Sequence, residues 1–256
     1  MNFTGHSILD HPAISGRYLF PQNRFVDDPF MVKVKGAELA CYRKIIDPEN
    51  FTMVHFHGNG EAVADYIPDM ADVFAGLGLN SLFVEYREYG GSTGEAHLVA
   101  MLGDGEAAIN AMGLAPAKAI AFGRSIGSLY AIELVCRQPE IAGLILESGI
   151  AEPSERFLTY ADFSAAGVEE SDVLAECKRH FNHKVKLTGY KNPLLVMHTE
   201  HDGLIDITHA QRNHKWAGST QKRLIRFAAG NHNTILGSNW EEYMAAIGSF
   251  VKTVRG

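Results

Sequence analysis

Residues 123–127 read GRSIG and place a serine between two glycines, a pattern that could carry nucleophilic chemistry. The apolar residues 119–122 before them predict a buried strand, and the apolar spacing after Gly127 predicts a helix. A G-x-S-x-G motif at a strand-to-helix joint is typical of a nucleophile elbow, whose strained turn lifts the serine hydroxyl above the sheet. We therefore expect Ser125 to be a nucleophile and the Ile126 amide to face a developing oxyanion. The alternative is that Ser125 only caps the helix.

A serine hydroxyl needs a base within hydrogen-bond reach near neutral pH, and that base needs an orienting acid. Asp202 follows one predicted strand, and His232 follows the last predicted strand. The order serine, aspartate, histidine, each in a loop after a strand, is expected of α/β-hydrolases. Asp202 would hold the His232 ring in the tautomer that accepts the Ser125 proton.

Each of these roles has rivals elsewhere in the sequence. Glu147 also ends a predicted strand and is an alternative acid, whereas Asp206 is better placed to cap the next helix, and Glu200 is a minor alternative. The other histidines considered as bases are His198 and His201 on the acid-bearing segment, His209 and His214 on a predicted surface helix, and His55 and His57, which we expect to be structural.

Residues 56–61 read FHGNGE directly after a predicted strand. A glycine-rich turn there lets a backbone amide, that of Asn59 or Gly60, supply a second oxyanion contact. The alternative is a plain strand-to-helix turn. Beside the nucleophile, the Arg124 guanidinium could hold a substrate carboxylate, although a structural ion pair with a nearby acid is the favoured interpretation.

Strands and helices that alternate along the chain must position these residues. Such alternation predicts an α/β fold, with a mostly parallel sheet and helices on both faces. Strands are expected at 52–56, 81–85, 118–122, 143–146, 194–198 and 223–227, with an edge hairpin at 30–35 and 38–45. Helices are expected at 63–77, 98–112, 128–138, 207–216 and 240–254.

The chain divides into an arm, a core and an insertion. Residues 1–29 are expected to form an N-terminal arm anchored by residues 18–20, and residues 30–150 and 193–256 the core. Residues 151–192 exceed what a crossover needs, so we expect a small helical lid, with a short helix at 171–181. Phe157 and Tyr160 could face the mouth of the pocket and bind substrate; equally, they could fill the core of the lid itself.

Composition limits the possible partners. A length of 256 residues with 46% hydrophobic content fits one α/β domain. A formal net charge of -7 and a pI near 5.9 argue against binding to nucleic acids or anionic membranes. Three cysteines far apart match neither a disulfide framework nor a metal site, and the first residues do not read as a signal peptide. We expect a cytoplasmic protein.

Six segments together resemble a known family: FHGNGE at 56–61, EYREYGGSTG at 85–94, GRSIGS at 123–128, GLILESG at 143–149, the Asp202 loop, and GNHN at 230–233. In this order they resemble the serine α/β-hydrolases of the BEM46-like group, from about residue 51 to residue 251. The resemblance implies an eight-strand sheet, a cofactor-free triad of Ser125, Asp202 and His232, and hydrolysis of a small-molecule ester or thioester.

Two departures from that group stand out. Relatives often have glycine where this chain has Glu88, and membrane-associated relatives carry an N-terminal cysteine cluster for acylation that is absent here, so no stable membrane anchor is expected. The leading hypothesis is a serine esterase or thioesterase that works through an acyl-enzyme. The alternatives are a non-catalytic module that binds an acyl or hydrophobic small molecule, and an acyltransferase that uses the same residues.

Overall fold

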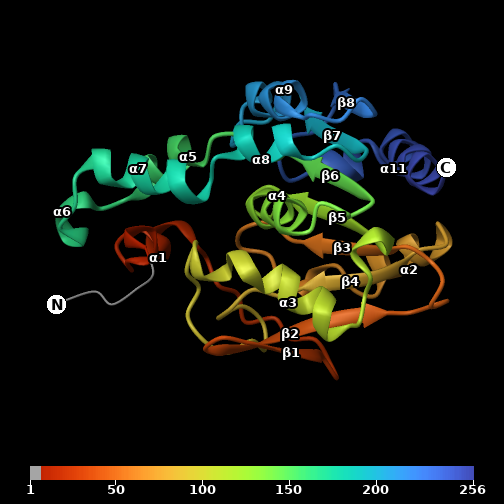
Figure 1. The fold of residues 1–256 in the computed structure, drawn as a ribbon, viewed down its shortest axis with the longest axis horizontal. Helices are drawn as coiled ribbons and strands as arrows, with labels where there is room; N and C mark the ends of the chain where they lie inside the picture. Colours follow the sequence, from red (N-terminus) through yellow and green to blue (C-terminus); the bar gives the residue numbers. More distant parts are fainter. Residues whose placement is uncertain (1–6) are drawn as a thin grey trace.

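The computed structural model describes residues 7–256, which form one open sheet of eight strands flanked by helices (Figure 1). The strand order is β1-β2-β4-β3-β5-β6-β7-β8; β2 is antiparallel to both β1 and β4, and the other neighbours are parallel. The strands are β1 Phe30–Val34, β2 Ala37–Lys44, β3 Thr52–Phe56, β4 Asn80–Val84, β5 Ala119–Arg124, β6 Gly143–Glu147, β7 Leu194–Thr199 and β8 Lys222–Phe227. The predicted α/β fold and its mostly parallel sheet are confirmed, with strand ends within two residues of expectation.

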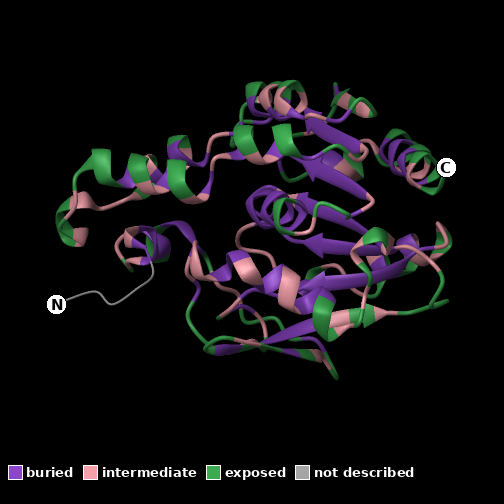
Figure 2. Ribbon diagram, viewed as in Figure 1, coloured by how far each residue is buried: buried purple, intermediate pink, exposed green. Residues whose placement is uncertain are grey.

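Helices cover both faces of the sheet, so the central strands are buried on both sides (Figure 2). All five residues of β3 are buried, as expected for a strand between two helical layers. One face carries α3 (Asp104–Ala111), α4 (Gly127–Arg137), α8 (His183–Gly189) and α9 (Ile207–Trp216), and the other carries α2 (Asp69–Gly76) and α11 (Trp240–Arg255). Successive strand residues point into alternate layers, and each layer forms its own hydrophobic core.

Two predicted helices are shorter than expected. The helix expected over 63–77 is divided into a 3₁₀ turn at Val63–Asp65 and helix α2, because Pro68 lacks the amide that a helix interior requires. The helix expected over 98–112 begins as a 3₁₀ turn at Ala100–Gly103 and continues as α3. In both segments the regular α-helix begins only after a 3₁₀ turn.

Four helices lie between β6 and β7: α5 (Pro153–Tyr160), α6 (Phe163–Ala166), α7 (Glu170–His180) and α8. Helices α5 to α7 extend beyond the sheet, beside α1 (Ser15–Tyr18) from the N-terminal arm (Figure 1). Helix α8 instead packs with α4 and α9, so the inserted segment ends as part of the helical layer.

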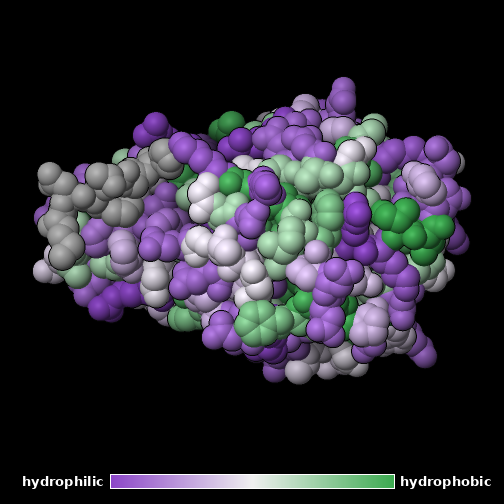
Figure 3. Space-filling model, turned by 90° about the horizontal axis from the view of Figure 1, so that it is seen from below, coloured by the Kyte–Doolittle hydropathy of each residue, from purple (hydrophilic) through white to green (hydrophobic). Residues whose placement is uncertain are grey.

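The N-terminal arm packs against the insertion and the core. The Ser15 hydroxyl donates to the Leu9 carbonyl at 2.7 Å and accepts from the Leu98 amide at 3.0 Å. Tyr18 and Leu19 are buried, as expected of the anchor, whereas Phe20 is 51% exposed. Seen from the β1 edge, hydrophilic and hydrophobic side chains are mixed over the surface (Figure 3). Between residues 7 and 256, no helix is both long and apolar enough to cross a membrane.

Candidate active site

Ser125 occupies the tight turn between β5 and α4, with a positive φ of 52°. A Cβ atom on Gly123 would lie 2.6 Å from the Gly127 carbonyl oxygen, and one on Gly127 would lie 2.2 Å from the Phe56 carbonyl oxygen. Only glycine therefore permits this close approach of strand and helix. The turn has the geometry that the motif predicts, and Ser125 is held in an unfavourable backbone conformation at the mouth of a cavity.

Ser125, His232 and Asp202 form a continuous hydrogen-bonded chain. The His232 Nε2 atom lies 2.9 Å from the Ser125 hydroxyl oxygen, and its Nδ1 atom lies 2.7 Å from the Asp202 carboxylate. All three residues are at most 8% exposed. They meet because the loops after β5, β7 and β8 lie at the same, carboxyl edge of a parallel sheet. The Ser125 side chain thus bonds an imidazole rather than capping α4.

Asp202 is held in its ionised form. One carboxylate oxygen accepts the amides of Leu204 and Ile205 at 2.9 and 2.8 Å, and the other faces both His232 and, at 3.3 Å, the His198 Nε2 atom. Burial alone would raise the pKa of Asp202, but the hydrogen bonds from His198 and His232 outweigh it and hold that pKa well below its usual value. A carboxylate in this state favours a proton on the facing ring nitrogen.

The three rival acids have other partners, and His198 does not bond Ser125. Glu147 accepts the Tyr243 hydroxyl and pairs with Arg124, Asp206 caps α9 by accepting the Thr208 amide at 2.9 Å, and Glu200 pairs with Arg226 at 2.9 Å. His198 donates to the Ile205 carbonyl at 2.7 Å and contacts the acid rather than the serine. None of these three carboxylates hydrogen-bonds His232 within the described residues.

The expected oxyanion contacts come from two separate turns. Ile126 is the N-terminal cap of α4, and Asn59 follows β3; both line the same cavity as Ser125. Within the described range, neither backbone amide donates to a protein acceptor. The Asn59 side chain fixes its turn by donating to the Tyr18 carbonyl at 2.5 Å and accepting the Tyr89 hydroxyl at 3.0 Å. Gly60 supplies a positive φ of 73° but does not line the cavity.

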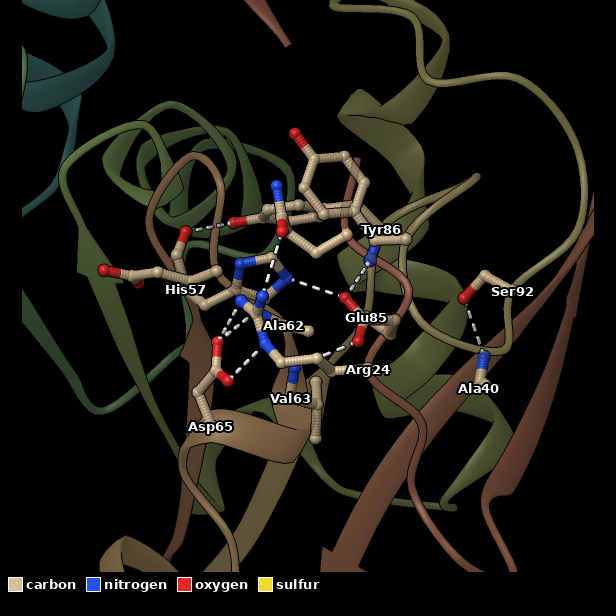
Figure 4. Close-up of polar contacts among 12 residues, drawn as sticks. Arg24, Ala40, His57, Ala62, Val63, Asp65, Glu85, Tyr86 and Ser92 are labelled. Carbon is tan, nitrogen blue, oxygen red and sulfur yellow. Dashed lines mark hydrogen bonds and ion pairs between the residues drawn. The ribbon is translucent and has the colours of Figure 1, made fainter. Parts of the chain in front are cut away.

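A buried ion pair supports the turn after β3 (Figure 4). The His57 Nε2 atom lies 2.7 Å from Glu85, and its Nδ1 atom lies 2.8 Å from the Gly58 carbonyl, so both ring nitrogens face acceptors. Burial alone would lower the pKa of His57, but the Glu85 carboxylate outweighs it, and the pKa is raised. Glu85 also accepts the amides of Val63 and Tyr86, which ties this turn to the next strand (Figure 4).

Arg124 lies beside Ser125 but faces two carboxylates. Its guanidinium is 2.5 Å from Glu61 and 3.1 Å from Glu147, and it donates to the His232 carbonyl at 3.2 Å. Burial opposes its charge, but the surrounding groups outweigh burial and raise the pKa of Arg124. The geometry therefore favours the structural ion pair over substrate binding. The hydrogen bond to the His232 carbonyl also connects Arg124 directly to the loop that carries His232.

The cavity above Ser125 has a volume of about 250 Å³. Tyr160 lines it, but Phe157 does not, because Phe157 is 1% exposed and packs between the rings of Tyr18 and Phe181. The expectation for Phe157 is corrected in favour of a core role. The lining residues are Tyr18, Phe20, Asn59, Arg124, Ser125, Ile126, Arg156, Tyr160, Leu204, Ile205, His232 and Asn233.

Sequence reasoning missed Arg156 in this cavity. The signal that could have found it is its spacing of four residues from Tyr160 on one helix, which places both side chains on the same face. In the part of the chain that the structure describes, no three histidine, cysteine or acidic residues cluster in a way that could hold a metal ion.

The fold and the sequence have relatives among known proteins. The chain superimposes on the esterase Pf2001 of Pyrococcus furiosus with a TM-score of 0.72 and 17% identity, over 91% of this chain and 98% of that one. The chain has the α/β-hydrolase fold. It is 24% identical over 200 residues to protein bem46 of Schizosaccharomyces pombe, covering 76% of this chain and 66% of that protein. It is 28% identical over 190 residues to human alpha/beta hydrolase domain-containing protein 17B, covering 70% and 60%.

These matches confirm the resemblance of this chain to the BEM46-like group. The chain spans 60–66% of the length of these two curated relatives, and no protein-family model matches it.

The departure at Glu88 has a structural explanation. Glu88 adopts a positive φ of 68°, a conformation that favours glycine, and its carboxylate accepts the Ala96 amide at 3.0 Å. That bond holds the loop in the conformation that glycine would otherwise permit.

Proposed function

We propose that this α/β-hydrolase is a serine hydrolase that cleaves a carboxylic ester or thioester through an acyl-enzyme. The observation that carries the proposal is the hydrogen-bonded chain from Asp202 through His232 to Ser125, which ends in a cavity. This arrangement joins a nucleophile, its base and an orienting acid. The esterase among the structural neighbours supports an ester substrate.

In the proposed mechanism, the Ser125 oxygen attacks the acyl carbonyl carbon as its proton passes to His232 Nε2. The Ile126 and Asn59 amides hold the oxyanion of the tetrahedral intermediate. His232 then gives the proton to the departing alcohol or thiol, which leaves an acyl group on Ser125. Water, deprotonated by His232, attacks this acyl-enzyme and releases the acid, and the proton returns to Ser125. Asp202 keeps the imidazole oriented and stabilises its protonated form throughout.

The cavity favours a small substrate. Its volume of about 250 Å³ lies below the range of roughly 300 to 1,000 Å³ that is typical of drug-sized ligands. We therefore expect kcat/KM for p-nitrophenyl esters to be highest for acyl chains of a few carbons and to fall for long chains.

Labelling with a fluorophosphonate tests the proposal. The wild-type protein should gain one phosphonyl adduct by intact mass, and Ser125→Ala should gain none. Ser249→Ala, which changes an exposed serine on α11, is the matched control and should label like the wild type. Hydrolysis of p-nitrophenyl acetate should be lost in His232→Ala.

An unlabelled wild type without esterase activity would refute the proposal and favour a non-catalytic small-molecule binder. Product analysis with competing alcohols or amines distinguishes the remaining alternative. Acyl transfer in preference to hydrolysis would show an acyltransferase that uses the same residues.

A further inference from the structure

Arg156 is a cation in the Ser125 cavity that has no carboxylate partner in the described part of the chain. Among residues 7–256 no acidic oxygen lies within 4.0 Å of its guanidinium. One terminal nitrogen donates to the Tyr160 hydroxyl at 3.2 Å, and the buried Nε atom makes no hydrogen bond. A guanidinium has five N–H donors, and a buried donor left unpaired is costly. Most of the binding capacity of Arg156 is therefore unused.

Two phenols hold this guanidinium at the cavity wall. It lies 5.5 Å from the centroid of the Tyr160 ring, on the same helix face. Tyr18 lies beside it as well; burial raises the pKa of Tyr18 to about 12 against the opposing charge of Arg156, so the phenol stays neutral near pH 7. Neither neighbour neutralises the cation.

No other group in the cavity supplies the missing negative charge. The lining contains neither aspartate nor glutamate, and the second lining arginine, Arg124, is already paired with two glutamates. Glu155, the acid next to Arg156 in sequence, faces away and pairs with Arg212 at 2.5 Å and His209 at 3.2 Å. Asp202 lies behind the His232 ring and takes its hydrogen bonds from the histidines and two amides.

We propose that Arg156 binds a carboxylate of the substrate, so that the substrate is a small ester or thioester with a second, anionic group. A planar guanidinium with free N–H groups matches a carboxylate in a two-bond contact, and the partial burial of Arg156 in the cavity strengthens that contact. This inference rests on the proposed function because it assigns a substrate class to the same site. It makes Arg156 a specificity-determining residue.

Paired substrates test the inference. The p-nitrophenyl half-ester of adipic acid carries a carboxylate at the end of its acyl chain, and p-nitrophenyl hexanoate has the same chain length without it. A second pair, 3-acetoxybenzoate and 3-acetoxytoluene, places the carboxylate on the alcohol side. The readout is the ratio of kcat/KM for the anionic ester to that for its neutral partner, so effects common to both substrates cancel.

We expect Arg156→Gln to lower this ratio by about 10- to 100-fold for at least one pair, the range typical of a hydrogen-bonded charge. Arg156→Lys should retain part of the ratio because it keeps the charge. Arg226→Gln, which changes an exposed arginine paired with Glu200, should leave the ratio at the wild-type value. The pair that responds identifies the side of the scissile bond on which the carboxylate lies.

An unchanged ratio for both pairs in Arg156→Gln, or equal losses on anionic and neutral esters, would overturn the inference and leave Arg156 a structural residue. The proposed function would survive that result, since hexanoate turnover and labelling of Ser125 test it separately. If no ester is hydrolysed, calorimetric titration with adipate still decides the matter. Binding by the wild type that Arg156→Gln weakens about tenfold or more supports the carboxylate site, and equal or absent binding refutes it.

Discussion

Replacing Arg124 by methionine tests the buried charge cluster beside Ser125. The guanidinium is 11% exposed and lies between two carboxylates, Glu147 at 4% and Glu61 at 23% exposure. Arg124→Met fills similar space but leaves two negative charges facing each other. Removing one partner of a buried ion pair costs about 3–5 kcal/mol. Because Glu61 reaches some solvent, we expect the lower end, about 3 kcal/mol of unfolding free energy at pH 8.

The loss should depend on pH in a defined direction. Burial raises the pKa of Glu147 even with Arg124 present, and removing the cation should raise it further. A carboxyl group whose folded pKa exceeds its unfolded value gives full stability below the unfolded value, about 4.5, and loses it as pH rises. The difference between wild type and Arg124→Met should therefore grow from pH 5 to pH 8.

Urea unfolding, followed by circular dichroism at pH 5, 6.5 and 8, measures this difference. Adding Glu147→Gln to Arg124→Met should recover part of the lost stability at pH 8, since one unpaired charge is removed. Arg226→Met, which breaks an exposed pair with Glu200, is the matched control and should cost about 1 kcal/mol or less. A loss below 1 kcal/mol for Arg124→Met at pH 8, or the same loss at pH 5 and pH 8, would refute the reasoning.

Three further predictions follow from the site. Asp202→Asn turns an acceptor into a donor toward the imidazole and should lower kcat by about 10⁴-fold; a loss below tenfold would remove the aspartate from its role. Gly127→Ala places a Cβ 2.2 Å from a β3 carbonyl and should cost about 4 kcal/mol or more in urea unfolding, whereas Gly237→Ala, in open space, should cost about 1 kcal/mol or less. Glu85 raises the pKa of His57, so the contribution of this pair to stability should be complete below about pH 6.5 and be lost as pH rises through the folded pKa; in urea unfolding Glu85→Gln should remove this part of the pH dependence, and an unchanged slope above pH 6.5 would contradict the proposed pairing.

The strands and the elbow could be predicted from sequence because their causes are local. A strand buried on both faces reads as an apolar run, as in β3, β5 and β7. Gly123 and Gly127 are required sterically, because a Cβ atom at either position would collide with nearby backbone atoms. The order of the loops after the strands then placed Asp202 and His232 at one edge of the sheet. Local periodicity gave a wrong prediction at Pro68. The apolar pattern continues through this proline, and we therefore expected one helix over 63–77, but the proline interrupts it.

What the sequence by itself determined was the fold class, the sheet and the chain order of the candidate site residues. Only the tertiary structure decided which groups face each other. Glu147 ends one strand and Asp202 follows another, yet Glu147 pairs with Arg124 and Asp202 bonds His232. Likewise, Phe157 turns into the core while Arg156, one residue earlier, reaches the cavity. The physical reason is that such contacts join residues distant in sequence, and the packing of helices over the sheet sets their directions.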